Sequence, residues 1–351
     1  MSWRKLIPAV VTVILVVACA IEPPLHLRQA LRIIVKVLWR AEVYPEGIKP
    51  TGVSLYVFRD NEFYMQHTTA SVDSCAIHLD PGRYKLYMIS QSPDEYAWLS
   101  FSDMDDFDAA RVSVIETKSR WYTRTDENEV LIGNPEVMTA AVSDDFEVTK
   151  EMIEEFVNKA AQADEVTTEG LVKYYTIRVP VHPECIVSQY WISIYSENAD
   201  VLKAVRASTT GMARTFYITA DKTGPETGTQ LITEWTLVMD DPINRVGHID
   251  GMITTFGFPN GEKPSPDRDP ELNVATLLVD NETVENYKFK VGNLITEEKP
   301  PDGYRALYRL ILGSVDDPVM HPPDVRPDED PSGFDASVSD WEEEEIKVIN
   351  M

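Results

Sequence analysis

The residue whose type and position could do chemistry is Cys19, a thiol that directly follows an apolar run. Arg4 and Lys5 form a short positive region, and residues 6–18 are almost wholly apolar. That run is shorter than the ~20 residues that a membrane-spanning helix needs, so it is typical of the core of a secretory signal peptide. A small residue, Ala18, stands just before the thiol, where a peptidase could reach the peptide bond. The chemistry on offer is cleavage between Ala18 and Cys19, followed by acylation of the thiol.

Residues 16–19, Val-Val-Ala-Cys, resemble the bacterial lipobox. In that pattern the thiol of Cys19 is diacylated, the chain is cut before it, and the new amine is usually acylated as well. Two or more acyl chains give stable membrane anchoring, whereas a single chain gives only marginal binding. We therefore expect a lipoprotein signal peptide at 1–18 and a lipidated N-terminal linker at 19–30. The alternative is an ordinary signal peptide that is followed by an incidental cysteine.

Other constellations that carry chemistry are missing from the sequence. It has no His-Glu-x-x-His zinc motif, no Gly-x-Ser-x-Gly nucleophile elbow and no phosphate-binding glycine loop. The six histidines are scattered, and the acidic runs at 103–108 and 328–330 do not have the spacing of an EF-hand loop. We therefore predict no enzymatic activity, no catalytic residues, no metal site and no cofactor.

Composition and charge fit an exported, well-solvated protein. The 351 residues carry 58 acidic and 32 basic side chains, a formal net charge of −26, which disfavours nucleic acid and anionic lipid headgroups as partners. Three cysteines are too few for a disulfide scaffold. After export, Cys75 and Cys185 could form a bridge, or they could stay unpaired as small buried side chains, and we favour the second alternative.

Short strands between Pro, Gly, Asp and Asn turns fill nearly the whole chain. Residues 31–40 alternate between an apolar and a basic face, which predicts a half-buried strand. Residues 149–162 have apolar side chains at helical spacing, with Thr149 as a possible N-cap, so we expect one amphipathic helix there. The pattern predicts an all-β fold of two antiparallel β-sandwich domains, at 31–165 and 170–315, with the helix near their boundary.

The end of the chain, residues 316–351, is an acidic, Pro-rich C-terminal segment. Its plain interpretation is a solvated tail. Apolar residues return near its end, which also allows a terminal strand that packs on the body or is given to a neighbouring molecule.

Four parts of the sequence together point to one protein family. They are the segment that ends at Cys19, residues 44–58, residues 207–213 with 251–257, and residues 333–341. In this order they resemble the fimbrillin-like lipoproteins of Bacteroidales, which include fimbrial stalk, anchor and accessory subunits. The resemblance implies two tandem transthyretin-like β-sandwich domains with few short helices, and display on the outer membrane through acyl chains. It also implies other fimbrial subunits as partners, with one subunit's strand completing the next subunit's sheet by β-augmentation.

The resemblance further implies a possible processing site. In the family's stalk subunits an Arg-directed protease removes an N-terminal strand, and the matching cut here would follow Arg40. The alternative that we favour is that Arg40 is the polar end of an intact strand, so that the chain stays on its lipid as an anchor, accessory or tip subunit. Two further hypotheses are a surface glycan-binding lipoprotein, with a host or glycan ligand that the sequence does not identify, and a periplasm-facing structural lipoprotein.

Overall fold

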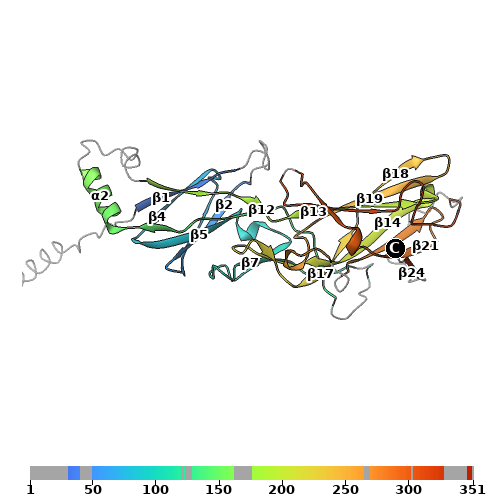
Figure 1. The fold of residues 1–351 in the computed structure, drawn as a ribbon, viewed down its shortest axis with the longest axis horizontal. Helices are drawn as coiled ribbons and strands as arrows, with labels where there is room; N and C mark the ends of the chain where they lie inside the picture. Colours follow the sequence, from blue (N-terminus) through green and yellow to red (C-terminus); the bar gives the residue numbers. More distant parts are fainter. Residues whose placement is uncertain are drawn as a thin grey trace, which may run out of the picture.

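The computed structural model describes residues 31–39, 50–119, 122, 129–161, 176–264, 269–301, 303–327 and 346–349. Within these ranges the chain forms an elongated body built almost wholly of β-strands, with the α-helix α2 (Lys150–Ala161) at one end of the long axis (Figure 1). The predicted all-β class is therefore confirmed. No helix in this part of the chain is long and apolar enough to cross a membrane.

Two sheets enclose a core at the end of the body that carries α2. Their strand orders are β11–β1–β4 and β12–β9–β5–β2–β3, with β10 also pairing with β5. The first sheet consists of β1 (Leu31–Val37), β4 (Ser74–Leu79) and β11 (Thr176–Val181). The second consists of β2 (Val53–Arg59), β3 (Glu62–Thr69), β5 (Gly82–Ser90), β9 (Thr139–Val142), β10 (Phe146–Val148) and β12 (Glu184–Cys185). Apolar side chains from both sheets form one buried cluster, which includes Val35, Leu55 and Leu86.

The helix predicted at 149–162 is confirmed as α2. The Oγ1 of Thr149 accepts a hydrogen bond from the backbone N–H of Met152 at 3.3 Å, which satisfies one of the unpaired N–H groups of the first turn. Ile153 is 3% exposed and joins the same buried cluster as β1. The helix thus packs on the two sheets through Ile153.

A second pair of sheets forms the opposite end of the body, with the orders β18–β19–β13–β23–β22 and β24–β21–β20–β14–β17–β8. The first consists of β13 (Ser188–Ser196), β18 (Trp235–Asp241), β19 (Val246–Thr255), β22 (Thr296–Glu298) and β23 (Leu307–Leu312). The second consists of β8 (Leu131–Ile132), β14 (Leu202–Ala213), β17 (Thr227–Ile232), β20 (Glu271–Leu278), β21 (Val284–Lys290) and β24 (Ile346–Ile349). Alternate residues of β13, namely Tyr190, Ile192 and Ile194, point into the core that these sheets share.

The two ends of the body share a third core at its middle, which we call the waist. There β6 (Leu99–Ser102) and β7 (Arg111–Val114) form one sheet with β15 (Thr215–Tyr217) and β16 (Lys222–Thr223). The buried cluster of the waist contains Phe58 and Tyr87 from the sheets at the α2 end, Phe216 from the waist sheet, and Phe256, which follows β19 of the opposite end. Two further pairings join the ends. Strand β8 pairs with β17 in a sheet of the opposite end, and β12 pairs with β9 in a sheet of the α2 end. The ends are therefore joined by shared sheets and a shared core.

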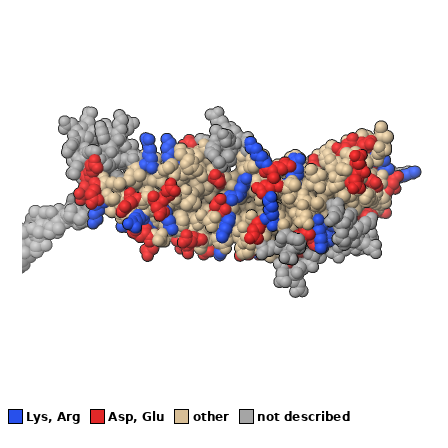
Figure 2. Space-filling model, in the orientation of Figure 1, with Lys and Arg blue, Asp and Glu red and all other residues tan. Residues whose placement is uncertain are grey.

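Short 3₁₀ helices lie in the connections of the described chain. They are η1 (Pro93–Glu95), η2 (Ala199–Val201), η3 (Pro259–Gly261) and η5 (Gly292–Leu294). On the face drawn in Figure 2, acidic and basic side chains are interspersed along the body.

Strand β11 pairs with a part of the chain far from it in sequence. The predicted second domain begins at residue 170, whereas β11 runs parallel to β1, with Val179 opposite Val35. It therefore belongs to the sheets at the α2 end. The division into domains at 31–165 and 170–315 stays a prediction.

The last described strand and the two described cysteines decide between the alternatives that the sequence allows for them. Strand β24 pairs in parallel with β21, so this part of the C-terminal segment lies on the body. Residues 328–345 lie outside the described residues. Cys75 and Cys185 are both buried and unpaired, which confirms the alternative that we favoured.

Candidate functional site

The residues that the sequence singles out for processing lie outside the described part of the chain. These are Ala18 and Cys19, the predicted positions of signal cleavage and lipidation, and Arg40, the possible protease site. Their roles stay predictions. The structure describes the strand that lies between them in sequence, β1, and a cleft at the waist, and the candidate sites are built from these two features.

Strand β1 is the middle strand of its sheet. It pairs in parallel with β11, where Val35 lies opposite Val179, and antiparallel with β4, where Val35 lies opposite Cys75. The pairing continues beyond the strand, because the N–H of Leu38 donates to the carbonyl of Val181 at 2.9 Å. Both edges of β1 are paired, so two ladders hold the strand.

The inward side chains of β1 are fully packed. Ile33 and Val35 are 0% exposed and Val37 is 4% exposed, whereas Lys36 points outward. The alternation of apolar and basic residues produces this two-faced strand, because successive side chains of a strand point to opposite sides. Burial of each such apolar side chain contributes about 1.5–3 kcal/mol, so the three together contribute about 5–9 kcal/mol. Removing β1 would open an apolar groove between β4 and β11.

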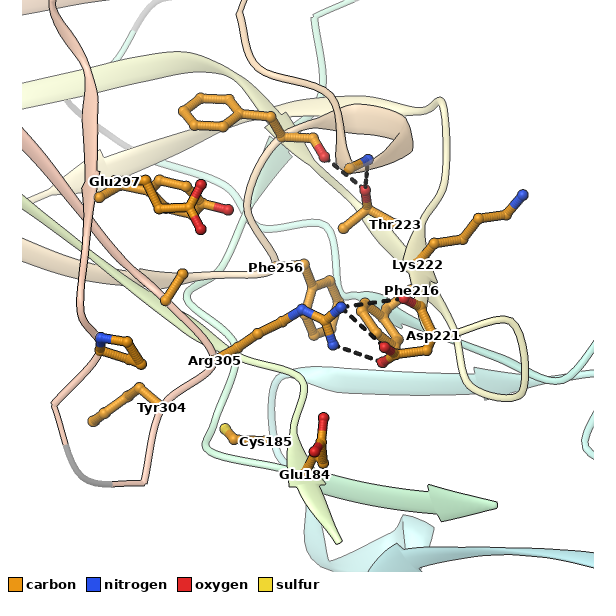
Figure 3. A pocket seen from close by; sticks show the side chains of 15 residues that line it. Glu184, Cys185, Phe216, Asp221, Lys222, Thr223, Phe256, Glu297, Tyr304 and Arg305 are labelled. Carbon is orange, nitrogen blue, oxygen red and sulfur yellow. Dashed lines mark hydrogen bonds and ion pairs between the residues drawn. The ribbon is translucent and has the colours of Figure 1, made fainter. Parts of the chain in front are cut away.

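A cleft of about 540 Å³ lies at the waist, between β12, the β15–β16 turn and the segment that leads into β23 (Figure 3). Its floor is aromatic, with Phe216 and Phe256 1% and 2% exposed. Its walls carry charged side chains of both signs. Volumes of about 300–1,000 Å³ with an aromatic lining and a few convergent polar groups are typical of small-molecule sites.

Arg305 and Asp221 form an ion pair in the cleft (Figure 3). The Nη1 of Arg305 donates to one carboxylate oxygen of Asp221 at 2.6 Å, and Nη2 donates to the other at 3.1 Å. The guanidinium lies 5.2 Å from the centre of the Phe216 ring, a cation–π contact. Burial acts to lower the pKa of Arg305, but the hydrogen bond and charge of Asp221 raise that pKa above its ordinary value. The pair is therefore ionised and geometrically fixed.

Hydrogen bonds to the backbone hold both sides of the cleft. The N–H of Arg305 donates to the carbonyl of Val187 at 2.8 Å. Across the cleft, the Oγ1 of Thr223 donates to the carbonyl of Phe258 at 2.6 Å and accepts from the N–H of Gly261 at 2.7 Å. These contacts position the lining residues before any ligand arrives.

The thiol of Cys185 borders the cleft but is not arranged for reaction. The residue is 3% exposed, and burial raises the pKa of its thiol to about 11, so the thiol stays protonated near neutral pH. In the described ranges of the chain, no group of three or more His, Cys, Asp or Glu side chains could hold a metal ion.

Sequence patterns gave no signal for this cleft. Arg305 and Asp221 are 84 residues apart, and neither belongs to a recognisable motif. Their meeting depends on how the strands of the waist pair, which no local pattern reports.

These features define an elongated all-β protein in which a central first strand completes the sheet at one end and a preformed cleft lies at the waist. The chain belongs to the family whose model is described as Domain of unknown function (DUF5119), which matches residues 26–233, more than half of the chain. No curated protein matches the sequence.

Comparison with solved structures finds adhesin and fimbrial proteins. The chain is similar to a candidate adhesin from Bacteroides ovatus ATCC 8483, at 13% identity and a TM-score of 0.52, over 85% of this chain and 94% of that chain. Weaker similarities are to the fimbrial anchor protein Mfa2 from Porphyromonas gingivalis (10% identity, TM-score 0.44, 80% and 90% covered) and to the tip fimbrial protein Mfa3 from the same organism (11%, 0.33, 80% and 94%). The predicted resemblance is confirmed, and at these identities the likeness concerns the fold.

Proposed function

We propose that the chain is a non-enzymatic cell-surface subunit of fimbrial or adhesin type, held on the outer membrane by acyl chains on Cys19. The fold that it shares with the Bacteroides ovatus protein and the lipobox-like residues 16–19 support this proposal. Its partners are other fimbrial subunits, joined to it by β-augmentation, in which backbone hydrogen bonds supply affinity and alternate side chains fill a groove.

Within an assembly, the chain acts as an anchor or accessory subunit that ends a fibre. The observation that carries this proposal is the central position of β1, with Ile33 and Val35 fully buried. A sheet that already contains its middle strand has no groove for a neighbour's strand. The chain would then give a strand without receiving one, and β24, at the edge of its sheet, is the strand that it could give.

A disulfide lock on β1 tests this proposal. Val35 lies opposite Cys75 in the antiparallel ladder. Cα atoms of such opposite residues are about 4.5–5.5 Å apart, within the range that a disulfide spans. The variant Val35→Cys would therefore bind β1 to β4 covalently under oxidising conditions. Because β1 stays in place in our proposal, the locked variant should join surface fibres as well as the unchanged chain, measured as a high-mass ladder in gels after mild denaturation.

The reduced Val35→Cys protein and the variant Val35→Ser, which cannot form the bond, are matched controls. If the locked form fails to assemble while the reduced form assembles, β1 has to leave and the closed-sheet proposal is wrong. N-terminal sequencing of surface material gives an independent answer. A blocked, lipidated Cys19 fits the anchor role, whereas an N-terminus at Ala41 means cleavage after Arg40 and a stalk role. If the unchanged chain forms no ladder, the fimbrial role itself is contradicted.

A further inference from the structure

The cleft at the waist is separate from the strands that the proposed assembly uses. Its lining comes from β12, β15, β16, the segment from the end of β19 to η3, β22, the segment around Arg305 and the start of β23, and includes no residue of β1 or β24. Its volume of about 540 Å³ and its fixed side chains leave room for a ligand that strand pairing does not explain.

The charges of the cleft restrict the ligand. The guanidinium of Arg305 lies in the middle of the view in Figure 3 and would repel a cationic group. Three carboxylates, of Glu184, Asp221 and Glu297, lie on different sides of it and would repel an anionic group, while the ammonium of Lys222 points away (Figure 3). A charged ligand of either sign would lose its water shell among these groups, and that desolvation costs free energy. An uncharged ligand is therefore favoured.

Tyr304 and Tyr308 line the cleft together with Arg305, which lies between them in sequence. The ring of Tyr308 packs edge-on against Phe258, with centroids 4.9 Å apart. Glu297 of β22 lies directly opposite Tyr308 of β23, so their side chains are neighbours on one face of the sheet. Burial, followed by the negative charge of Glu297, raises the pKa of Tyr308. An apolar ring surface thus stands beside hydrogen-bond acceptors and donors.

We propose that the cleft binds a neutral sugar unit of a glycan, such as a hexose or an N-acetylhexosamine. Its hydroxyl groups donate to the carboxylates of Glu184 and Glu297 and accept from those N–H groups of Arg305 that Asp221 leaves. The apolar face of the sugar ring lies against Tyr304. Because Arg305 is already held by Asp221, little ordering of the site opposes binding.

The test uses the full chain, purified in detergent, on an array of multivalent neutral mono- to tetrasaccharides. Sialylated and sulfated glycans and oligolysine serve as charged comparators. We expect retention of at least one neutral glycan and no retention of the charged probes. Retention of no neutral glycan, or preference for a charged probe, would overturn the proposal.

Two neighbouring glutamates on β22 give a matched pair of variants. Glu297 lines the cleft, whereas Glu298 lies outside the lining and pairs with Arg309 at 3.5 Å. Both side chains are exposed, so Glu297→Gln and Glu298→Gln should keep the melting temperature of the unchanged chain. Glu297→Gln should weaken binding of the retained glycan about tenfold, the effect of losing one hydrogen bond to a charged group, while Glu298→Gln should change it less than about twofold.

A second variant keeps this result interpretable. Tyr304→Ala should also weaken binding about tenfold, because the ring contact with the sugar is lost. If Glu297→Gln and Tyr304→Ala both bind the glycan like the unchanged chain, the glycan binds elsewhere and the proposal is wrong. Fibre assembly of these variants should be normal, so that failure here is distinguishable from failure of the assembly proposal.

Discussion

Replacing Phe216 by Ala tests whether the waist core holds the two ends of the body together. The ring is 1% exposed, lies 6.0 Å from the ring of Phe256, and carries the guanidinium of Arg305 at 5.2 Å. Truncating a buried Phe to Ala costs about 3–5 kcal/mol, because burial energy is lost and a cavity remains. The lost cation–π contact adds about 0.5–1 kcal/mol. Folded proteins are stable by about 5–15 kcal/mol, so this single change removes a large share of the total.

Urea unfolding, followed by fluorescence of single-tryptophan variants, can report on each end. Trp39 packs on the core at the α2 end, and Trp235 packs on the core at the opposite end. In the single-tryptophan proteins that keep Phe216, we expect both probes to show the same transition, because the shared sheets make the body one cooperative unit. In Phe216→Ala both midpoints should fall together. The control Phe63→Ala removes a ring that is 42% exposed and should cost about 1 kcal/mol or less.

Two results would refute this reasoning. Separate transitions for Trp39 and Trp235 in the unchanged protein would mean that the ends fold independently. A shift in Phe216→Ala confined to Trp235 would mean that the waist core belongs to one end alone.

Further predictions concern glycines and thiols. Alanine at Gly247 would press its Cβ against the backbone carbonyl oxygen of Val238, which cannot move aside, and should cost about 3 kcal/mol or more in thermal unfolding. Gly261→Ala meets open space and should cost only about 1–2 kcal/mol for its φ of +68°. A loss at Gly247 no greater than the loss at Gly261 would contradict this. Burial raises the pKa of both Cys75 and Cys185 to about 11, so both thiols should resist iodoacetamide in the folded protein and react after unfolding, as peptide mass mapping can measure. The pKa values of both thiols are higher in the folded than in the unfolded state. The stability that the protonated thiols contribute is therefore complete below the ordinary pKa of 9.0 and should be lost as the pH rises through about 11. An unchanged urea midpoint between pH 9 and pH 11 would contradict this.

Local patterns were sufficient to predict β1 and α2. The alternation in residues 31–40 depends only on which side of a strand faces apolar neighbours, and the structure buries that apolar side. Thr149 caps α2 through its own side chain, an interaction that spans three residues. Such features require no knowledge of distant parts of the chain.

Strand partners could not be predicted in the same way. Ser113 of β7 lies opposite Thr215 of β15, 102 residues away, and an alternating pattern states that a strand exists without naming its neighbour. The parallel placement of β11 beside β1 has the same cause. The candidate site residues show the same contrast between local and distant features. Cys19 stands out in the sequence because of the residues next to it. Arg305 and Asp221 are 84 residues apart and meet only after the waist has formed.

Cleavage after Arg40 would cut the chain beside β1 without by itself releasing the strand. The burial of Ile33, Val35 and Val37 holds β1 by about 5–9 kcal/mol, while its ladder hydrogen bonds and the chain entropy gained on release are of similar size and opposite sign. For a fragment that cleavage has separated from the body, that energy corresponds to a dissociation constant of about 10⁻⁴ to 10⁻⁷ M. At protein concentrations above this range the groove stays filled, and release then requires an incoming strand with apolar side chains at alternate positions, so cleavage and exchange have to be coupled.

This coupling can be measured on the full chain with a specific protease sequence inserted after Arg40. After cutting, native mass spectrometry at a protein concentration above about 10⁻⁴ M should find the fragment that contains β1 still bound to the body. A labelled peptide of residues 31–39 should replace it slowly, whereas the same peptide with Val35→Asp should not, because that peptide would bury an unpaired carboxylate. Spontaneous loss of the fragment without a competing peptide would show that burial does not hold β1. The filled sheet would then present no barrier to a stalk role, since cleavage alone would open the groove.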